Sequence, residues 1–128
     1  MSVRSVRLGT ARSRGEGLRI GTVRLPPRGV PKREWAKQNF YDVWFPELAP
    51  SAAIVKKAQA AQTDRDWAAF ARKYRAEMKA PEKQRILDLL AALSHHASFS
   101  VGCYCADESR CHRSLLRELL AERGADLA

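Results

Sequence analysis

Three stretches of the chain have hydrophobic patterns that predict β-strands. Residues 18–25 (LRIGTVRL) alternate apolar and polar positions, although imperfectly, and residues 3–8 follow a similar pattern. Residues 98–105 (SFSVGCYC) are rich in small, aromatic and β-branched side chains, which is typical of a buried strand. The two clearer strands are therefore far apart in the sequence, with most of the chain between them.

Four segments have the spacing and the end signals of helices. Ser51 follows a proline and is a candidate N-cap, and Pro81 suits the first turn of a helix. Thr63, with Asp66 three positions later, resembles a capping box. The predicted helices cover approximately residues 51–61, 64–79, 81–95 and 110–123.

Strands separated by helices predict an α/β fold, with a small parallel or mixed sheet and helices packed on it in a single domain. The chain of 128 residues is long enough to bury a core without added cross-links. We divide it into a basic N-terminal arm, residues 1–17, part of which can pair as an edge strand, and an α/β domain, residues 18–128. The helix over residues 64–79 should face the core with one apolar stripe, formed by Trp67, Phe70, Ala71, Tyr74 and Met78.

A long connection, residues 26–50, separates the second strand from the first helix. It opens with two prolines and a glycine, which stop regular structure, and it carries five aromatic side chains. We expect these rings to pack on the domain or on a ligand, because a free loop would not expose so many. Its last residues predict a helix entry at which the Ser51 hydroxyl caps free N–H groups.

The composition excludes several classes of protein. No apolar run approaches the length of about 20 residues that spans a bilayer, so we expect no membrane contact. The first residues, MSVRSVRLGTARSRG, contain no apolar segment of a signal peptide, and we do not expect secretion. The three cysteines are clustered and cannot all pair with one another, which predicts reduced thiols in a cytoplasmic protein.

The net charge of +9 is concentrated at the start of the chain. Residues 1–37 contain ten Lys or Arg side chains and only two acidic ones, Glu16 and Glu34. Such a segment attracts phosphate groups and nucleic acid, or it serves only as a solubilising arm. Charge alone does not decide between these two roles.

The candidate chemistry lies in the stretch VGCYCADESRCHRSLLRELL, residues 101–120. The pattern predicts a strand, a tight loop and the first turn of a helix. In open α/β folds, ligands bind outside the carboxyl ends of strands, where helix N-termini offer free N–H groups. The placement of this stretch therefore matters as much as its residue types.

A metal site is one interpretation of the cluster. Cys103 and Cys105 are two positions apart on a strand and should point to one face, and Cys111 returns at the helix start. Zinc takes thiolate and imidazole ligands, but Cys111 and His112 should diverge by about 100° if both lie on a helix. This geometry disfavours a metal site, and we expect neither a metal ion nor a cofactor. A structural zinc module is kept as the third hypothesis.

A catalytic thiol is the second interpretation. The span from Cys105 to Arg110 has the length of an anion-binding loop, but Asp107 and Glu108 within it would repel an anion. Cys111 is the better nucleophile, because a helix terminus and neighbouring cations favour its thiolate and His112 is adjacent. The commoner fate of such a cysteine is to be a buried, inert thiol.

Anion binding is the remaining interpretation. Arg110 and Arg113 in the first helical turn form an anion-receptive end, unless they serve only as partners of nearby carboxylates. Upstream, Arg28 and Lys32 flank Gly29, which can adopt a positive φ and let the backbone approach a ligand, or can simply form a rigid turn.

Motifs along most of the chain resemble the YeaO-like family of bacteria and archaea, whose function is not established. The resemblance runs from about residue 18 to residue 120 and implies a compact α/β domain without indicating a reaction. The motifs that carry it are Arg24, Pro27-Arg28-Gly29, Lys32, Asp42, Trp44, Leu48-Ala49-Pro50-Ser51, Cys105 and Cys111-His112-Arg113.

Our first hypothesis is a domain that binds a phosphate-bearing small molecule or nucleic acid where the loop at Arg28 and Gly29 meets the segment 105–113. The second is a thiol-dependent enzyme that uses Cys111 or Cys105, assisted by His112 and Arg113. The sequence leaves open whether any reaction is catalysed, and it does not predict the oligomeric state.

Overall fold

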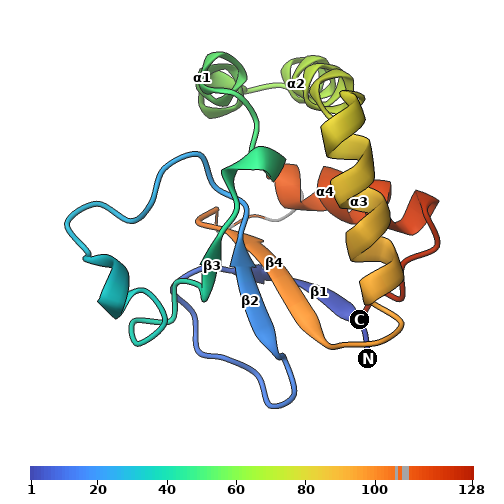
Figure 1. Cartoon of the computed structure of the whole chain (residues 1–128). Coiled ribbons are helices and arrows are strands. Elements are labelled where there is room, and N and C mark those ends of the chain that lie inside the picture. The colour runs from blue at the N-terminus through green and yellow to red at the C-terminus, as the bar shows by residue number, and fades with distance from the viewer. Residues whose placement is uncertain (106, 108–109) are drawn as a thin grey trace.

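The computed structural model describes residues 1–105, 107 and 110–128. Four parallel strands form one sheet in the order β1-β4-β2-β3 (Figure 1). The strands are Val3–Arg7 (β1), Leu18–Gly21 (β2), Val43–Trp44 (β3) and Phe99–Cys103 (β4). The predicted α/β class and the parallel sheet are therefore confirmed.

The helices form in the order that the sequence predicts, with shorter ends. Their bounds are Ala52–Ala60 (α1), Asp64–Glu77 (α2), Pro81–Leu93 (α3) and His112–Glu122 (α4). The capping box is confirmed, because Thr63 Oγ1 accepts a hydrogen bond from the Asp66 N–H at 3.1 Å. Ser51 occupies the N-cap of α1, but its side chain makes no capping hydrogen bond, so that part of the prediction is wrong.

The helices lie on one face of the sheet (Figure 1). On that side, apolar residues of β2 and β4 join the predicted stripe of α2 and the inner face of α4 in one core. The stripe is confirmed, because Phe70, Tyr74 and Met78 are buried and Trp67 and Ala71 pack against the same core.

The opposite face of the sheet is covered by the segment that joins β1 to β2 and by residues 39–41. Arg19 on β2 is fully buried there and donates to the carbonyl oxygens of Thr10 and Asn39 at 2.9 and 2.7 Å. Gly21 permits the close approach of Tyr41, because a Cβ at Gly21 would lie 2.3 Å from the Tyr41 ring. The aromatic connection thus contributes to the body of the protein, as the sequence predicts.

The N-terminal segment is part of the sheet, not a free arm. β1 pairs in parallel with β4, with Val3 opposite Phe99 and Arg7 opposite Cys103. The two ends of the chain also meet, because the Val3 N–H donates to Asp126 O at 2.9 Å. Deleting residues 1–17 would therefore remove a strand as well as positive charge.

Candidate active site

The cysteine cluster lies outside the carboxyl ends of β4 and β2, which are neighbours in the sheet. β4 ends at Cys103, β2 is followed by Thr22, and α4 begins with Cys111 at its N-cap. A cavity of about 480 Å³ opens here, and Cys103, Cys105, Cys111 and His112 are among the residues that line it. This is the edge of an open α/β sheet at which ligands usually bind.

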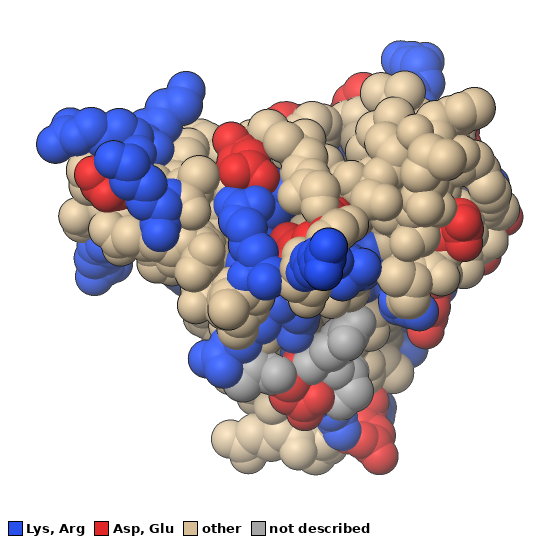
Figure 2. Space-filling view, turned by 90° about the horizontal axis from the view of Figure 1, so that it is seen from below, with Lys and Arg blue, Asp and Glu red and all other residues tan. Residues whose placement is uncertain are grey.

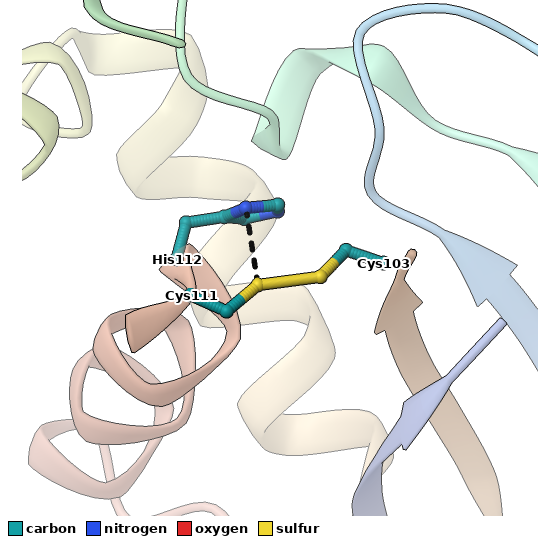
Figure 3. A group of neighbouring side chains, drawn as sticks. All are labelled: Cys103, Cys111 and His112. Carbon is teal, nitrogen blue, oxygen red and sulfur yellow. Dashed lines mark hydrogen bonds between the residues drawn. A yellow bond between two sulfur atoms is a disulfide. The ribbon is translucent and has the colours of Figure 1, made fainter. Parts of the chain in front are cut away.

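A disulfide joins Cys103 to Cys111 across this edge (Figure 3). Both residues are buried, each with 2% of its surface exposed, whereas Cys105 is exposed and not bonded. The expectation of three reduced thiols is therefore wrong for this structure. The fold brings the end of a strand against the start of a helix, and this contact was not visible in the sequence.

The prediction that Cys103 and Cys105 share a face is also wrong. β4 ends at Cys103, so the alternation of side chains does not extend to Cys105. Instead, the Cys105 backbone N–H donates to Cys103 Sγ at 3.4 Å. The backbone of Cys105 therefore contacts the disulfide, while its thiol is exposed.

His112 is held in one orientation by a backbone carbonyl. Its Nε2 lies 2.7 Å from Thr22 O, and because a carbonyl oxygen only accepts, Nε2 carries the hydrogen. Thr22, which follows β2, is held in place by β4, since both its N–H and its hydroxyl donate to Gly102 O. The Nδ1 atom is left without a hydrogen and faces Cys111 Sγ at 3.8 Å (Figure 3).

The His112 imidazole is neutral over the physiological pH range. Burial lowers its pKa to about 4, and the nearby charge of Arg113 acts in the same direction, against the bond to Thr22. Neutral imidazole with a lone pair on Nδ1 can accept a hydrogen bond or bind a metal ion.

Cys111 and His112 converge, although the sequence predicted that they would diverge. Cys111 is the N-cap and has extended backbone angles, φ −130° and ψ 149°, so the helical rotation of 100° per residue does not apply to it. The ligand atoms of Cys103, Cys111 and His112 consequently lie within 4.8 Å of one another. This set could hold a soft metal ion, and its residues come from β4 and α4.

Three cations lie in the otherwise mostly apolar lining of the cavity. Arg24, Lys56 and Arg110 line it, and none of the other described lining residues is acidic. Arg24 is anchored, because it donates to Pro50 O and Ala49 O at 3.2 and 3.0 Å. The arrangement favours an anionic ligand beside the disulfide.

The two arginines that the sequence predicted at the start of α4 have different environments. Arg110 lines the cavity and forms an ion pair with Asp64 at the start of α2. Arg113 is buried and donates to Cys105 O at 2.9 Å, so it supports the backbone next to the site without lining the cavity. The loop between Cys105 and Arg110 lies mostly outside the described residues, with only residue 107 described.

Arg28, Gly29 and Lys32 do not line the cavity. They are exposed on the connection between β2 and β3, which extends away from the sheet (Figure 1). With Arg33 and Lys37, Arg28 and Lys32 form a group of exposed cations that we call the basic lobe. Figure 2 shows Lys and Arg side chains gathered over this end of the molecule.

The sequence did not indicate a role for Thr22 or Lys56, and it indicated Cys103 only as a metal ligand. Thr22 acts through its backbone carbonyl. Every residue type has this group, so the sequence does not indicate the contact. Lys56 lies on an exposed helix face, and only the packing of α1 brings it to the cavity. The cysteine cluster did point to Cys103, but the identity of its partner depends on the distance between β4 and the start of α4.

Fold and site together define an open α/β domain with a cysteine and histidine site at the carboxyl edge of a parallel sheet. The chain belongs to the DUF488-N3a family, described as the active DUF488-N3 subclade, whose model matches residues 3–124. An uncharacterised family is thus confirmed, whereas the name YeaO-like is not. Comparison with curated proteins and with solved structures gave no match.

None of the helices in the described part of the chain has the length and apolar character needed to cross a membrane.

Proposed function

We propose that the protein is a thiol-dependent enzyme that reduces a small disulfide substrate through Cys103 and Cys111. The observation that carries this proposal is the pair of bonded sulfur atoms at the wall of a cavity of about 480 Å³. A purely structural disulfide has no need of a cavity, whereas an exchange reaction requires one for its substrate. The family description includes the word active, which accords with a reaction.

Cys111 is the attacking thiol in this proposal. Its position at the N-cap of α4 places its sulfur at the positive end of a helix of 11 residues, where a thiolate is stabilised. His112 Nδ1 lies 3.8 Å from Cys111 Sγ, and the bond to Thr22 keeps the ring aligned. Because the lowered pKa of His112 keeps the ring neutral, the thiol proton passes to solvent in the cavity.

The reaction begins when the Cys111 thiolate attacks one sulfur of the substrate disulfide. A mixed disulfide forms, and the other half of the substrate leaves as a thiolate. The Cys103 thiolate then attacks Cys111 Sγ, closes the Cys103–Cys111 bond and expels the second half. The substrate gains two electrons, and the protons of the two cysteines pass to the departing thiolates. A dithiol reductant then reduces the Cys103–Cys111 disulfide and returns the protein to its reduced form.

The test uses full-length protein, reduced with a phosphine and then freed of reductant. Adding a small disulfide should oxidise Cys103 and Cys111 to one intramolecular bond, as shown by mass spectrometry of the peptides. Cys103→Ser should accumulate a mixed disulfide on Cys111, because the resolving thiol is missing. Cys105→Ser should react like the wild type. The proposal fails if only the exposed Cys105 forms mixed disulfides and the other two thiols stay reduced.

A phosphate-bearing small molecule is the second candidate occupant of the cavity. The lining cations Arg24, Lys56 and Arg110 support it, as does the lack of acidic side chains among the described lining residues. In this case the protein would bind such a ligand whether or not the thiols react. A panel of nucleotides should raise the melting temperature of the wild type and have a smaller effect on Lys56→Gln.

A further inference from the structure

The site that holds the disulfide has a second property, which follows from the same three side chains. Cys103 Sγ, Cys111 Sγ and a ring nitrogen of His112 lie within 4.8 Å of one another, and all three residues line the cavity. In a tetrahedral zinc site with two Cys ligands and one His ligand, bonds of about 2.3 and 2.0 Å place the donor atoms roughly 3.5–3.8 Å apart. Zinc binding therefore requires the two sulfur atoms to be reduced and to move apart.

The backbone spacing is compatible with an ion between the sulfur atoms. The Cα atoms of Cys103 and Cys111 are 7.9 Å apart, which leaves room for an ion between the two sulfur atoms once they are reduced. A metal ion that bridges two thiolates lengthens the path between the two Cα atoms. The strand end and the helix start are thus far enough apart for a thiolate–metal–thiolate link.

The orientation of His112 is the independent observation that points to a metal ligand. Its Nε2–H donates to Thr22 O at 2.7 Å, which leaves the Nδ1 lone pair directed toward Cys111 Sγ (Figure 3). Histidines that bind metals usually donate their other ring N–H to a carbonyl or a carboxylate, which fixes the tautomer and the ring. The N–H of Cys105 on Cys103 Sγ supplies a similar outer contact for one sulfur atom.

We propose that the reduced protein binds one zinc ion through Cys103 Sγ, Cys111 Sγ and His112 Nδ1, with the fourth position open to the cavity. Two thiolates and one imidazole favour a soft, tetrahedral ion such as zinc over magnesium or calcium. The described residues supply three ligands, so a small molecule or water completes the coordination. A site of this kind can polarise a bound ligand, which a closed structural site with four protein ligands cannot do.

The disulfide and the zinc site exclude each other, because they use the same two sulfur atoms. Binding of zinc to the two thiols releases two protons, and oxidation of the thiolates by a small disulfide releases the ion. Metal occupancy therefore depends on the redox state. The inference does not require the proposed exchange reaction, since reduction by any dithiol or phosphine opens the site.

The test is a titration of the phosphine-reduced, full-length protein with Co²⁺ in the absence of oxygen. One equivalent should produce thiolate-to-cobalt charge-transfer absorption and the visible bands of a tetrahedral ion, and one equivalent of Zn²⁺ should remove them. Cys105→Ser should retain this spectrum, whereas Cys103→Ser and Cys111→Ser should lose it. His112→Gln, whose amide can still donate to Thr22 O, should weaken binding about tenfold or more.

Oxidised wild-type protein is the control that does not depend on the folding of any variant. It keeps the chain unchanged and removes both thiolates, so it should give no cobalt spectrum. The proposal is overturned if the reduced wild type shows no stoichiometric spectrum, if the oxidised protein binds equally well, or if Cys105→Ser abolishes binding. None of these outcomes affects the disulfide-exchange assay, so the two proposals are tested separately.

Discussion

Glu16 and Arg19 form a buried ion pair on the face of the sheet opposite the helices. Arg19 Nε lies 2.7 Å from Glu16 Oε2, and Arg19 NH2 lies 2.9 Å from Oε1, so the contact is bidentate. Only 2% of the Glu16 surface is exposed, and the Ser100 hydroxyl of β4 donates to the same carboxylate at 2.8 Å. The pair thus links the segment before β2 to two neighbouring strands.

We expect Glu16→Ala to lower the free energy of unfolding by about 3–5 kcal/mol, because it leaves the buried Arg19 charge without its partner. Urea unfolding followed by circular dichroism measures this loss. The matched control is Glu118→Ala, which removes one of the two exposed carboxylates that pair with Arg75 and should cost less than about 1 kcal/mol. Equal losses in the two variants would contradict the structural role of the buried pair.

The same carboxylate predicts a stability that depends on pH. Burial raises the pKa of Glu16, but hydrogen bonds from Arg19, Ser100 and Ser13 outweigh it and bring the pKa from 4.5 to about 2. A pKa that is lower in the folded state gives stability that is fully present above about pH 4.5 and is lost between pH 4.5 and 2.

We therefore expect the unfolding free energy of the wild type to fall across this acid range, and that of Glu16→Gln to fall less. Denaturant titrations at fixed temperature and several pH values provide the comparison. Parallel curves for the two proteins would assign the acid loss to other carboxylates.

Lys56 should give the site a preference for anionic substrates. It lines the cavity, whereas its neighbour Lys57 does not, although both are exposed on α1. We expect reduced wild-type protein to react faster with an anionic disulfide such as oxidised glutathione than with neutral hydroxyethyl disulfide. Lys56→Gln should lower this rate ratio by about two- to fivefold, as expected for one partly screened charge.

Lys57→Gln is the control, because it removes the same charge from the same helix and should leave the ratio near that of the wild type. A ratio that changes equally in both variants would indicate a general effect of net charge, and the assignment of Lys56 to the site would be dropped.

The basic lobe should bind nucleic acid weakly and without sequence preference. Its cations are exposed and separate from the cavity, so binding should depend on the release of counterions and weaken with salt. Replacing Lys32, Arg33 and Lys37 with Ala should make the slope of log K against log salt shallower by about two to three. Fluorescence anisotropy with a labelled duplex at several salt concentrations measures the slope.

The control is a triple alanine variant with the same loss of charge on the outer face of α2. If it changes the slope as much as the variant in the basic lobe, the binding is spread over the whole surface. The cations replaced in this control are Arg65, Arg72 and Lys73.

The sequence predicted local structure well where a pattern repeats within a few residues. The stripe of α2 and the capping contact of Thr63 with Asp66 formed as expected, because both depend on residues three or four positions apart. The burial of β4 and the inner face of α4 followed from apolar composition in the same way. These features depend on residues that are only a few positions apart in the chain.

Local patterns failed at the ends of elements. Cys103 and Cys105 were placed on one face because the strand was expected to continue, but β4 ends at Cys103. Cys111 and His112 were expected to diverge because both were placed within a helix, but Cys111 has extended angles at the N-cap. A difference of two residues at each of these boundaries changed both the metal interpretation and the thiol interpretation.

The α/β class, the helical stripes and the presence of a cysteine and histidine cluster at a strand-to-helix junction could be predicted from the amino-acid sequence. The contact of Cys103 with Cys111, the orientation of His112 by Thr22 and the position of Lys56 at the cavity, which Arg28 does not reach, became clear from the packed fold. The reason is that these contacts join β2, β4, α1 and α4, whose relative positions depend on how the strands pair and the helices pack. Thr22 and His112 are 90 positions apart in the chain, and no pattern of a few residues records their contact.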